Sequence, residues 1–224
     1  MIAHRGASGH EVENSLAAFR AAAAEGADAV ELDVYSTADG AFVIHHEEQI
    51  GGHALPQTSL RELRGFRLAN GEPLPTLEEA LAAIVPRLIA CVEIKSLARD
   101  AEERLLETIE ATGAVSRVMV HSFDHRVIRR LGARRPGIRR GIAAASYPVY
   151  PVRALEDADA TIRWQHAGYV DPELVARMHA AGMQLFVWTV NEPAELTRFL
   201  EMGVDGLCTD FPDRARALCD ARRD

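Results

Sequence analysis

The stretch that decides the fold runs from Ala29 to Glu47 and reads AVELDVYSTADGAFVIHHE. It predicts two strands joined by a turn at Asp39-Gly40. Because side chains alternate between the two faces of a strand, Glu31 and Asp33 share one face and the apolar residues take the other. Two carboxylates on one face of a buried strand are costly unless a cation or a salt bridge compensates them. The pattern leaves open both a cation site and a salt-bridged or solvated edge strand.

The second strand of this pair is expected to run from Val43 to His46. On such a strand His46 shares a face with Ile44, and His45 points to the opposite face. Histidine exchanges protons near neutral pH, so a histidine at a strand end is a candidate acid or base. His46 is therefore the candidate site residue, and His45 is expected to be a structural or exposed neighbour.

Composition narrows the classes of partner. The 224 residues include 25 Lys and Arg against 33 Asp and Glu, a net charge of −8, which disfavours a nucleic-acid-binding protein. No apolar stretch approaches the ~20 residues of a membrane span, so no stable membrane insertion is expected. The start of the chain carries no signal-peptide pattern, which predicts a cytoplasmic protein. The three cysteines, Cys91, Cys208 and Cys219, are widely spaced and are expected to be reduced thiols.

Strand-like and helix-like segments alternate along the whole chain. After the stretch above, strands are expected near 88–95, 118–121, 138–143, 161–164, 183–190 and 204–209, each followed by a helical segment. About eight such units predict an α/β protein with a (β/α)8 TIM barrel fold. We expect a single domain over residues 1–224, with a short insertion of about 47–74 after the second strand. The alternative is an open doubly wound sheet, although the chain has no G-x-G-x-x-G motif or Walker loop.

Polar residues gather at the predicted strand ends, where a barrel of this type places its active site. They are His4 and Arg5, Glu31 and Asp33, His46, Glu93 and Lys95, His121 and Ser122, and Trp188 and Asn191. Structural roles remain open for several of them. His4 fits a buried core histidine, Arg5 fits an ordinary ion pair, and Glu93 and Lys95 fit a mutual salt bridge, while His121 and Trp188 fit barrel lining.

The candidate residues suit a cation and a phosphate group. Glu31, Asp33 and Glu93 form an oxygen-rich set without a cysteine, which favours a hard cation, Mg²⁺ or Ca²⁺. Arg5 and Lys95 add positive charge, and a pocket of this charge fits a phosphate anion. Histidines beside such a pocket are suited to proton transfer.

With these residues in view, the chain resembles the glycerophosphodiester phosphodiesterase family over nearly its whole length. The matching segments are His4-Arg5-Gly6, Glu13-Asn14-Ser15, Glu31-Leu32-Asp33-Val34, Asp39-Gly40 with Val43-Ile44-His45-His46, Leu74-Pro75-Thr76-Leu77-Glu78-Glu79, Glu93-Ile94-Lys95, Ser122-Phe123-Asp124, Val187-Trp188-Thr189-Val190-Asn191 and Gly203-Val204-Asp205-Gly206. Each segment is weak by itself, but their order and spacing are specific.

The resemblance implies a (β/α)8 barrel that hydrolyses glycerophosphodiesters to sn-glycerol 3-phosphate and an alcohol. It also implies the roles of the site residues. His4 and His46 would be the catalytic acid–base pair, Glu31, Asp33 and Glu93 would hold one divalent cation, Mg²⁺ or Ca²⁺, Arg5 and Lys95 would bind the phosphate, and Trp188 would line the substrate pocket.

Two other functions remain open at this point. The same site would serve a lysophospholipase D or a phospholipase that acts on phosphatidylglycerol, for which an apolar rim on the insertion is expected. A catalytically silent barrel that binds a phosphorylated metabolite is the second alternative. The expected partner is in each case a small phosphate-bearing molecule, and the sequence leaves the headgroup and the oligomeric state open.

Overall fold

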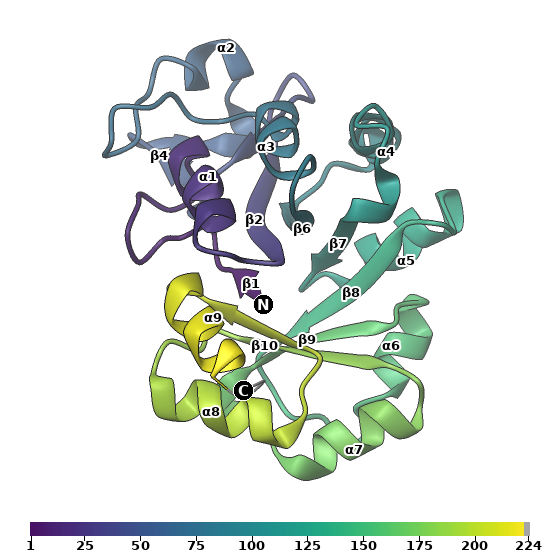
Figure 1. The fold of residues 1–224 in the computed structure, drawn as a ribbon. Coiled ribbons are helices and arrows are strands. Elements are labelled where there is room, and N and C mark those ends of the chain that lie inside the picture. The colour runs from purple at the N-terminus through teal and green to yellow at the C-terminus, as the bar shows by residue number, and fades with distance from the viewer. Residues whose placement is uncertain (222–224) are drawn as a thin grey trace.

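The computed structural model describes residues 1–221, in which eight parallel strands form a closed barrel surrounded by helices (Figure 1). Residues 222–224 of the predicted domain lie outside the described residues. The barrel strands are β1 (Ile2–Ala3), β2 (Ala29–Ser36), β6 (Ile89–Ser96), β7 (Val118–Ser122), β8 (Arg139–Ala144), β9 (Ile162–His166), β10 (Gln184–Trp188) and β11 (Gly206–Thr209).

Helices connect these strands in the order that the sequence predicts. They are α1 (Leu16–Ala24), α3 (Leu77–Ile84), α4 (Glu102–Glu110), α5 (His125–Arg134), α6 (Arg153–Ala158), α7 (Pro172–Ala180), α8 (Pro193–Met202) and α9 (Pro212–Asp220). Short 3-10 turns lie at η2 (Arg99–Ala101), η3 (Val115–Arg117) and η4 (Ala167–Tyr169).

Strand β1 closes the barrel because it pairs on both sides. Ile2 lies opposite Cys208 of β11 on one side and opposite Ala29 of β2 on the other, and both pairings are parallel. An open doubly wound sheet would leave β1 or β11 with a free edge, so the closure confirms the barrel and rules out that alternative.

Local sequence signals start and stop the helices as expected. The Ser15 side chain accepts a hydrogen bond from the backbone of Ala18 and so caps α1. Thr76 and Glu79 form the predicted capping box at the start of α3. Gly203 ends α8 with a positive φ of 78°, a conformation that costs glycine little.

Two apolar regions hold the barrel together. The larger one lies between the outer faces of the strands and the helices, as Phe19, Leu105 and Phe199 illustrate. The smaller one fills the barrel interior and includes Trp164, Phe186 and two of the cysteines. Cys91 and Cys208 are free and buried in β6 and β11, as the sequence predicts, and Cys219 is also free.

Strand β3 (Phe42–Ile44) is shorter than the sequence predicts, because it ends two residues before His46. It pairs antiparallel with β2, so that Phe42 lies opposite Ser36 and Ile44 lies opposite Val34. The backbone N–H of His45 still donates to the carbonyl oxygen of Asp33 in β2, at 3.1 Å, and no further pairing follows. His45 and His46 therefore lie beyond the strand, and the prediction that the strand extends to His46 is wrong.

The insertion has a small core of its own. It contains β4 (Gln49–Ile50), β5 (His53–Ala54), η1 (Leu55–Gln57) and α2 (Leu60–Leu63), and it lies beside the barrel near α1 and α3 (Figure 1). Leu55 and Leu63 are fully buried against Tyr35 and Val43, and Ile50, Leu60 and Phe66 pack on the same cluster. These residues therefore do not form the exposed apolar rim that an enzyme acting on lipids was expected to carry.

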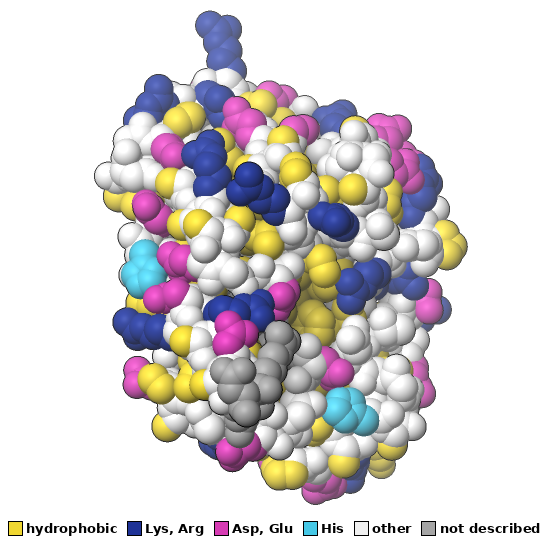
Figure 2. All heavy atoms as spheres, in the orientation of Figure 1, with side chains coloured by type: hydrophobic (Ala, Val, Ile, Leu, Met, Phe, Trp, Pro, Cys, Tyr) yellow, Lys and Arg dark blue, Asp and Glu magenta, His cyan; other side chains and the backbone are white. Residues whose placement is uncertain are grey.

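The surface shows no sign of a membrane-spanning element. Among the described residues, no helix combines the length and the apolarity that crossing a bilayer requires. Charged side chains of both signs are interspersed on the face shown in Figure 2.

A packing test follows from the barrel interior. A Cβ atom added to Gly141 would lie 2.8 Å from Trp164, whose side chain is buried and stacked on another ring. We expect Gly141→Ala to lower the free energy of unfolding by ~1–3 kcal/mol, because an overpacked core must shift. Gly137→Ala is the matched control, since nothing lies within 4 Å of the added atom. Equal stability of the two variants in urea denaturation would contradict the packing described.

Candidate active site

A cavity of about 260 Å³ opens at the carboxyl ends of the barrel strands. Its volume suits a small molecule. Seven of the eight site residues predicted from the sequence line it, and the eighth, Asp33, is buried behind them. The lining residues are His4, Arg5, Glu31, His46, Glu93, Lys95, His121, Phe123, Ala143, Trp164, Trp188 and Cys208.

Glu31 supplies a buried carboxylate with one uncompensated oxygen. Its Oε2 accepts a hydrogen bond of 3.1 Å from the backbone N–H of Arg5. Its Oε1 is buried and has no hydrogen-bond partner among the described residues. Burial, and then the charges of Asp33 and Glu93, raise the pKa of Glu31 well above its usual value. A bound cation would relieve this cost.

Asp33, in contrast, has partners at both oxygens. Lys95 Nζ lies 3.0 Å from its Oδ1, and Arg5 Nε lies 3.3 Å from its Oδ2. The side-chain amide of Asn14 also donates to Oδ2, at 2.8 Å. Burial would raise the pKa of Asp33, but Lys95 and Arg5 outweigh burial, and the pKa is lowered. Asp33 is therefore an anion that holds the two basic side chains of the site in place.

Lys95 bridges the carboxylates of two neighbouring strands. Its Nζ lies 2.6 Å from Glu93 Oε1 as well as 3.0 Å from Asp33 Oδ1. The salt bridge between Glu93 and Lys95 that the sequence allows is thus present. Lys95 also forms a second salt bridge, with Asp33. Burial would lower the pKa of Lys95, and the two carboxylates outweigh this effect and raise it. Lys95 remains a cation, as phosphate binding requires.

A carboxylate that sequence reasoning missed orients His4. Asp210 directly follows β11, and its Oδ1 lies 2.7 Å from His4 Nδ1. Ser8 and Asn191 donate to the same carboxylate at 2.9 and 2.6 Å. Burial would raise the pKa of Asp210, but the hydrogen bond and charge of His4 lower it to about 2. The position of Asp210 at a strand end was the signal that would have identified it.

The two neighbouring histidines differ in position. His46 lines the cavity, and its Nδ1 lies 3.0 Å from Glu47 Oε1. His45 is not among the lining residues, and its Nδ1 lies 2.9 Å from the carbonyl oxygen of Glu47. Of these two neighbours, His46 is therefore the one that faces the cavity.

Aromatic rings also line the cavity. Phe123, which sequence reasoning did not single out, meets Trp188 edge to face with ring centroids 5.7 Å apart. His121 stacks on Trp164 with centroids 4.0 Å apart and is buried. Burial lowers the pKa of His121 to about 3, so its imidazole is neutral at neutral pH.

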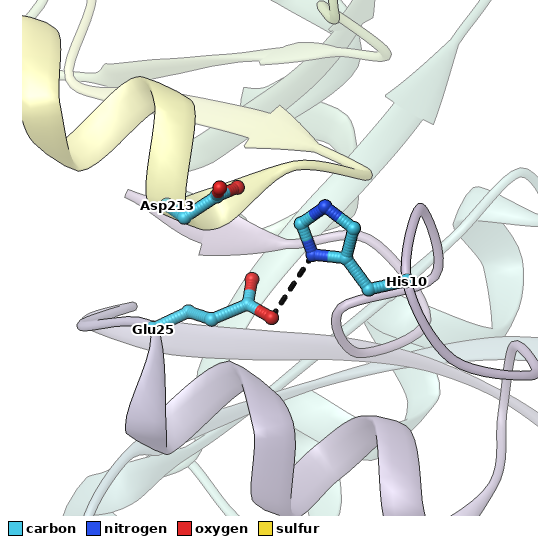
Figure 3. Close-up of side chains that lie close together, drawn as sticks. All are labelled: His10, Glu25 and Asp213. Atoms are coloured by element: carbon cyan, nitrogen blue, oxygen red, sulfur yellow. Dashed lines mark hydrogen bonds and ion pairs between the residues drawn. The ribbon is translucent and has the colours of Figure 1, made fainter.

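Two groups of side chains in the described part of the chain are spaced as metal ligands would be. Glu31, Glu93 and His121 form one group inside the cavity. His10, Glu25 and Asp213 form the other, where the loop after β1, the end of α1 and the start of α9 meet (Figure 3). In the second group, His10 Nδ1 lies 3.0 Å from Glu25 Oε1, and the carboxylate of Asp213 lies nearby.

Comparisons with known proteins agree with this geometry. A model of the glycerophosphoryl diester phosphodiesterase family matches residues 4–214. A glycerophosphodiester phosphodiesterase of Caldanaerobacter subterraneus is 32% identical, with 95% of this chain and 94% of the relative covered. A probable glycerophosphodiester phosphodiesterase 2 of Mycobacterium tuberculosis is 33% identical, with 99% and 90% covered.

Solved structures show the same architecture. A glycerophosphodiester phosphodiesterase from Parabacteroides distasonis superposes with a TM-score of 0.92 at 27% identity, with 100% of this chain and 97% of that chain covered. A phosphodiesterase from Oleispira antarctica, solved with the product sn-glycerol-3-phosphate, gives 0.83 at 27% identity, with 98% and 96% covered. The family match over most of the chain, together with the barrel and its cavity, shows that the protein is an enzyme of the glycerophosphoryl diester phosphodiesterase family.

Proposed function

We propose that the protein hydrolyses glycerophosphodiesters to sn-glycerol 3-phosphate and an alcohol, with a divalent cation and two histidines. The observation that carries the proposal is that His4, His46, Arg5 and Lys95 line one cavity together with buried carboxylates. The Oleispira antarctica relative, which holds sn-glycerol-3-phosphate, supports the identity of the product. Release of glycerol 3-phosphate from a panel of diesters tests the proposal, and no turnover of any diester would leave only a binding protein.

The cation is Mg²⁺ or Ca²⁺, and Glu31, Asp33 and Glu93 would hold it. The unpartnered Oε1 of Glu31 supports this role, because a buried carboxylate oxygen without a partner is otherwise costly. When bound, such an ion supplies positive charge that stabilises the phosphoryl oxygens.

His4 and His46 divide the proton transfers. The carboxylate of Asp210 orients the imidazole of His4, an arrangement suited to a general base. His4 therefore takes the proton of the glycerol hydroxyl next to the phosphate, and the hydroxyl oxygen attacks phosphorus. His46 gives a proton to the departing alcohol oxygen as the P–O bond breaks. Water then opens the resulting cyclic phosphate to glycerol 3-phosphate.

The remaining side chains bind the substrate. Arg5 and Lys95 pair with the phosphate oxygens. Asp33 holds both of these basic side chains at the cavity edge. Trp188 covers the carbon atoms of the substrate. A cytoplasmic location remains a prediction from the sequence, and cell fractionation tests it.

Removal of metal is expected to abolish turnover, because the cluster of carboxylates needs a cation to bind an anionic substrate. Activity should return with Mg²⁺ or Ca²⁺ and should survive chelator that has been saturated with Mg²⁺ beforehand. The measurement is glycerol 3-phosphate release after dialysis against chelator. Full activity in protein with no detectable metal would sink the proposed cation.

His46→Gln is expected to lower kcat by ~10²–10⁴-fold, the usual contribution of a positioned acid or base. His45→Gln is the matched control and should cost little, because His45 does not line the cavity. A substrate with a p-nitrophenol leaving group needs little protonation and should partly spare the His46 variant. Loss of activity in the His45 variant alone would show that the two roles are reversed.

Asp210→Asn tests the carboxylate that orients His4. Because the pKa of Asp210 is lowered in the folded protein, its stabilising effect is present above its ordinary pKa and is lost as the pH falls towards about 2. We expect the variant to be less stable than the wild type at pH 6, and the difference to shrink as the pH falls from 5 towards 2. Urea denaturation across this range measures it, and a difference that is constant with pH would contradict the lowered pKa of Asp210.

A further inference from the structure

His121 places a nitrogen among the carboxylates of the cavity. It lies directly opposite Glu93 in the pairing of β7 with β6, and its Nε2 is 3.9 Å from Glu93 Oε2. One ring nitrogen of His121 and one carboxylate oxygen each from Glu31 and Glu93 all lie within 4.8 Å of one another. Small side-chain movements would bring these three atoms onto one ion.

The imidazole is held in place and lacks a partner. Its ring stacks on Trp164 at an interplanar angle of 6°, and the side chain is only 2% exposed. Its Nδ1 is buried without a hydrogen-bond partner among residues 1–221. Histidines that serve only a structural role in a core usually have such a partner. With its proton on Nδ1, the imidazole offers the lone pair of Nε2, the nitrogen 3.9 Å from Glu93 Oε2, as a ligand atom.

Asp33 is less available than His121. Lys95, Arg5 and Asn14 occupy its two oxygens, whereas Glu31 Oε1 and His121 Nδ1 have no hydrogen-bond partner in the described residues. Glu31 and His121 are therefore among the cavity side chains with an unpartnered polar atom, and both belong to the group that could hold a metal.

We propose that His121 coordinates the divalent cation together with Glu31 and Glu93. This inference rests on the proposed metal dependence and adds a nitrogen ligand to the oxygen set. An imidazole ligand suits transition-metal ions such as Zn²⁺ better than it suits Ca²⁺, so a mixed nitrogen and oxygen set favours transition-metal ions over Ca²⁺. His121 therefore determines which metal the enzyme prefers.

The second group of possible ligands must be removed before the test. His10, Glu25 and Asp213 lie outside the cavity and also offer a nitrogen and two carboxylates (Figure 3). His10→Asn takes away the nitrogen of this group, so the full-length His10→Asn protein is the parent for the experiment.

The experiment measures the nitrogen coupling of bound Mn²⁺ by pulsed electron paramagnetic resonance. The parent is expected to show ¹⁴N modulation, and His121→Phe, which keeps a ring against Trp164, should lose it. Mn²⁺ affinity in calorimetry should fall about 10-fold or more, whereas Ca²⁺ affinity should change less. His121→Gln provides a second variant if His121→Phe does not fold.

The controls separate this inference from the proposed function. His4→Gln and His46→Gln, introduced singly into the parent, should keep the modulation, because neither residue belongs to the group around Glu31 and Glu93. Tight Mn²⁺ binding without ¹⁴N modulation in the parent would overturn the role of His121 and leave the proposed metal dependence intact. Modulation that disappears with His4→Gln but persists without His121 would also overturn it. No Mn²⁺ binding would overturn both.

Discussion

The balance of charge between β2 and β6 is the constraint on which the site depends. Glu31 and Asp33 are buried beside the half-buried Glu93, and Lys95 and Arg5 compensate only part of their charge. Burying carboxylates side by side is unfavourable in a protein without a function for them. The pKa of Glu31 is raised and that of Asp33 is lowered, so the positive charges compensate the two carboxylates unevenly. Glu31 is therefore suited to a cation, and Asp33 is suited to positioning the basic side chains.

Closure of the barrel brings the rest of the chemistry to this cluster. Because β1 pairs with both β2 and β11, the residues that follow these strands meet at one end. His4 reaches Asp210 across 206 positions in the sequence, and the backbone of Arg5 reaches Glu31. The fold thus brings His4, Arg5 and the carboxylates to one end of the barrel through its strand pairings.

The sequence predicts the barrel and most of the cavity because alternation and strand ends are local signals. It does not predict which charges pair. Asp33 and Glu93 look equivalent as ligands, yet only the structure shows that Asp33 is held by Arg5 and Asn14 as well as Lys95. The role of Asp210 and the availability of His121 depend on contacts between distant strands. The end of β3 at Ile44 is likewise not predicted by the periodicity of the apolar residues.

The most direct test of the account is a crystal structure of the protein soaked with Mn²⁺, with anomalous differences used to locate the ion. The account predicts a single strong peak within the cavity, in contact with carboxylate oxygens of Glu31 and Glu93. A well-diffracting crystal with saturating Mn²⁺ and no peak there, or with its strongest peak beside His10, Glu25 and Asp213, would contradict the central claim that the buried carboxylates of β2 and β6 exist to hold a metal.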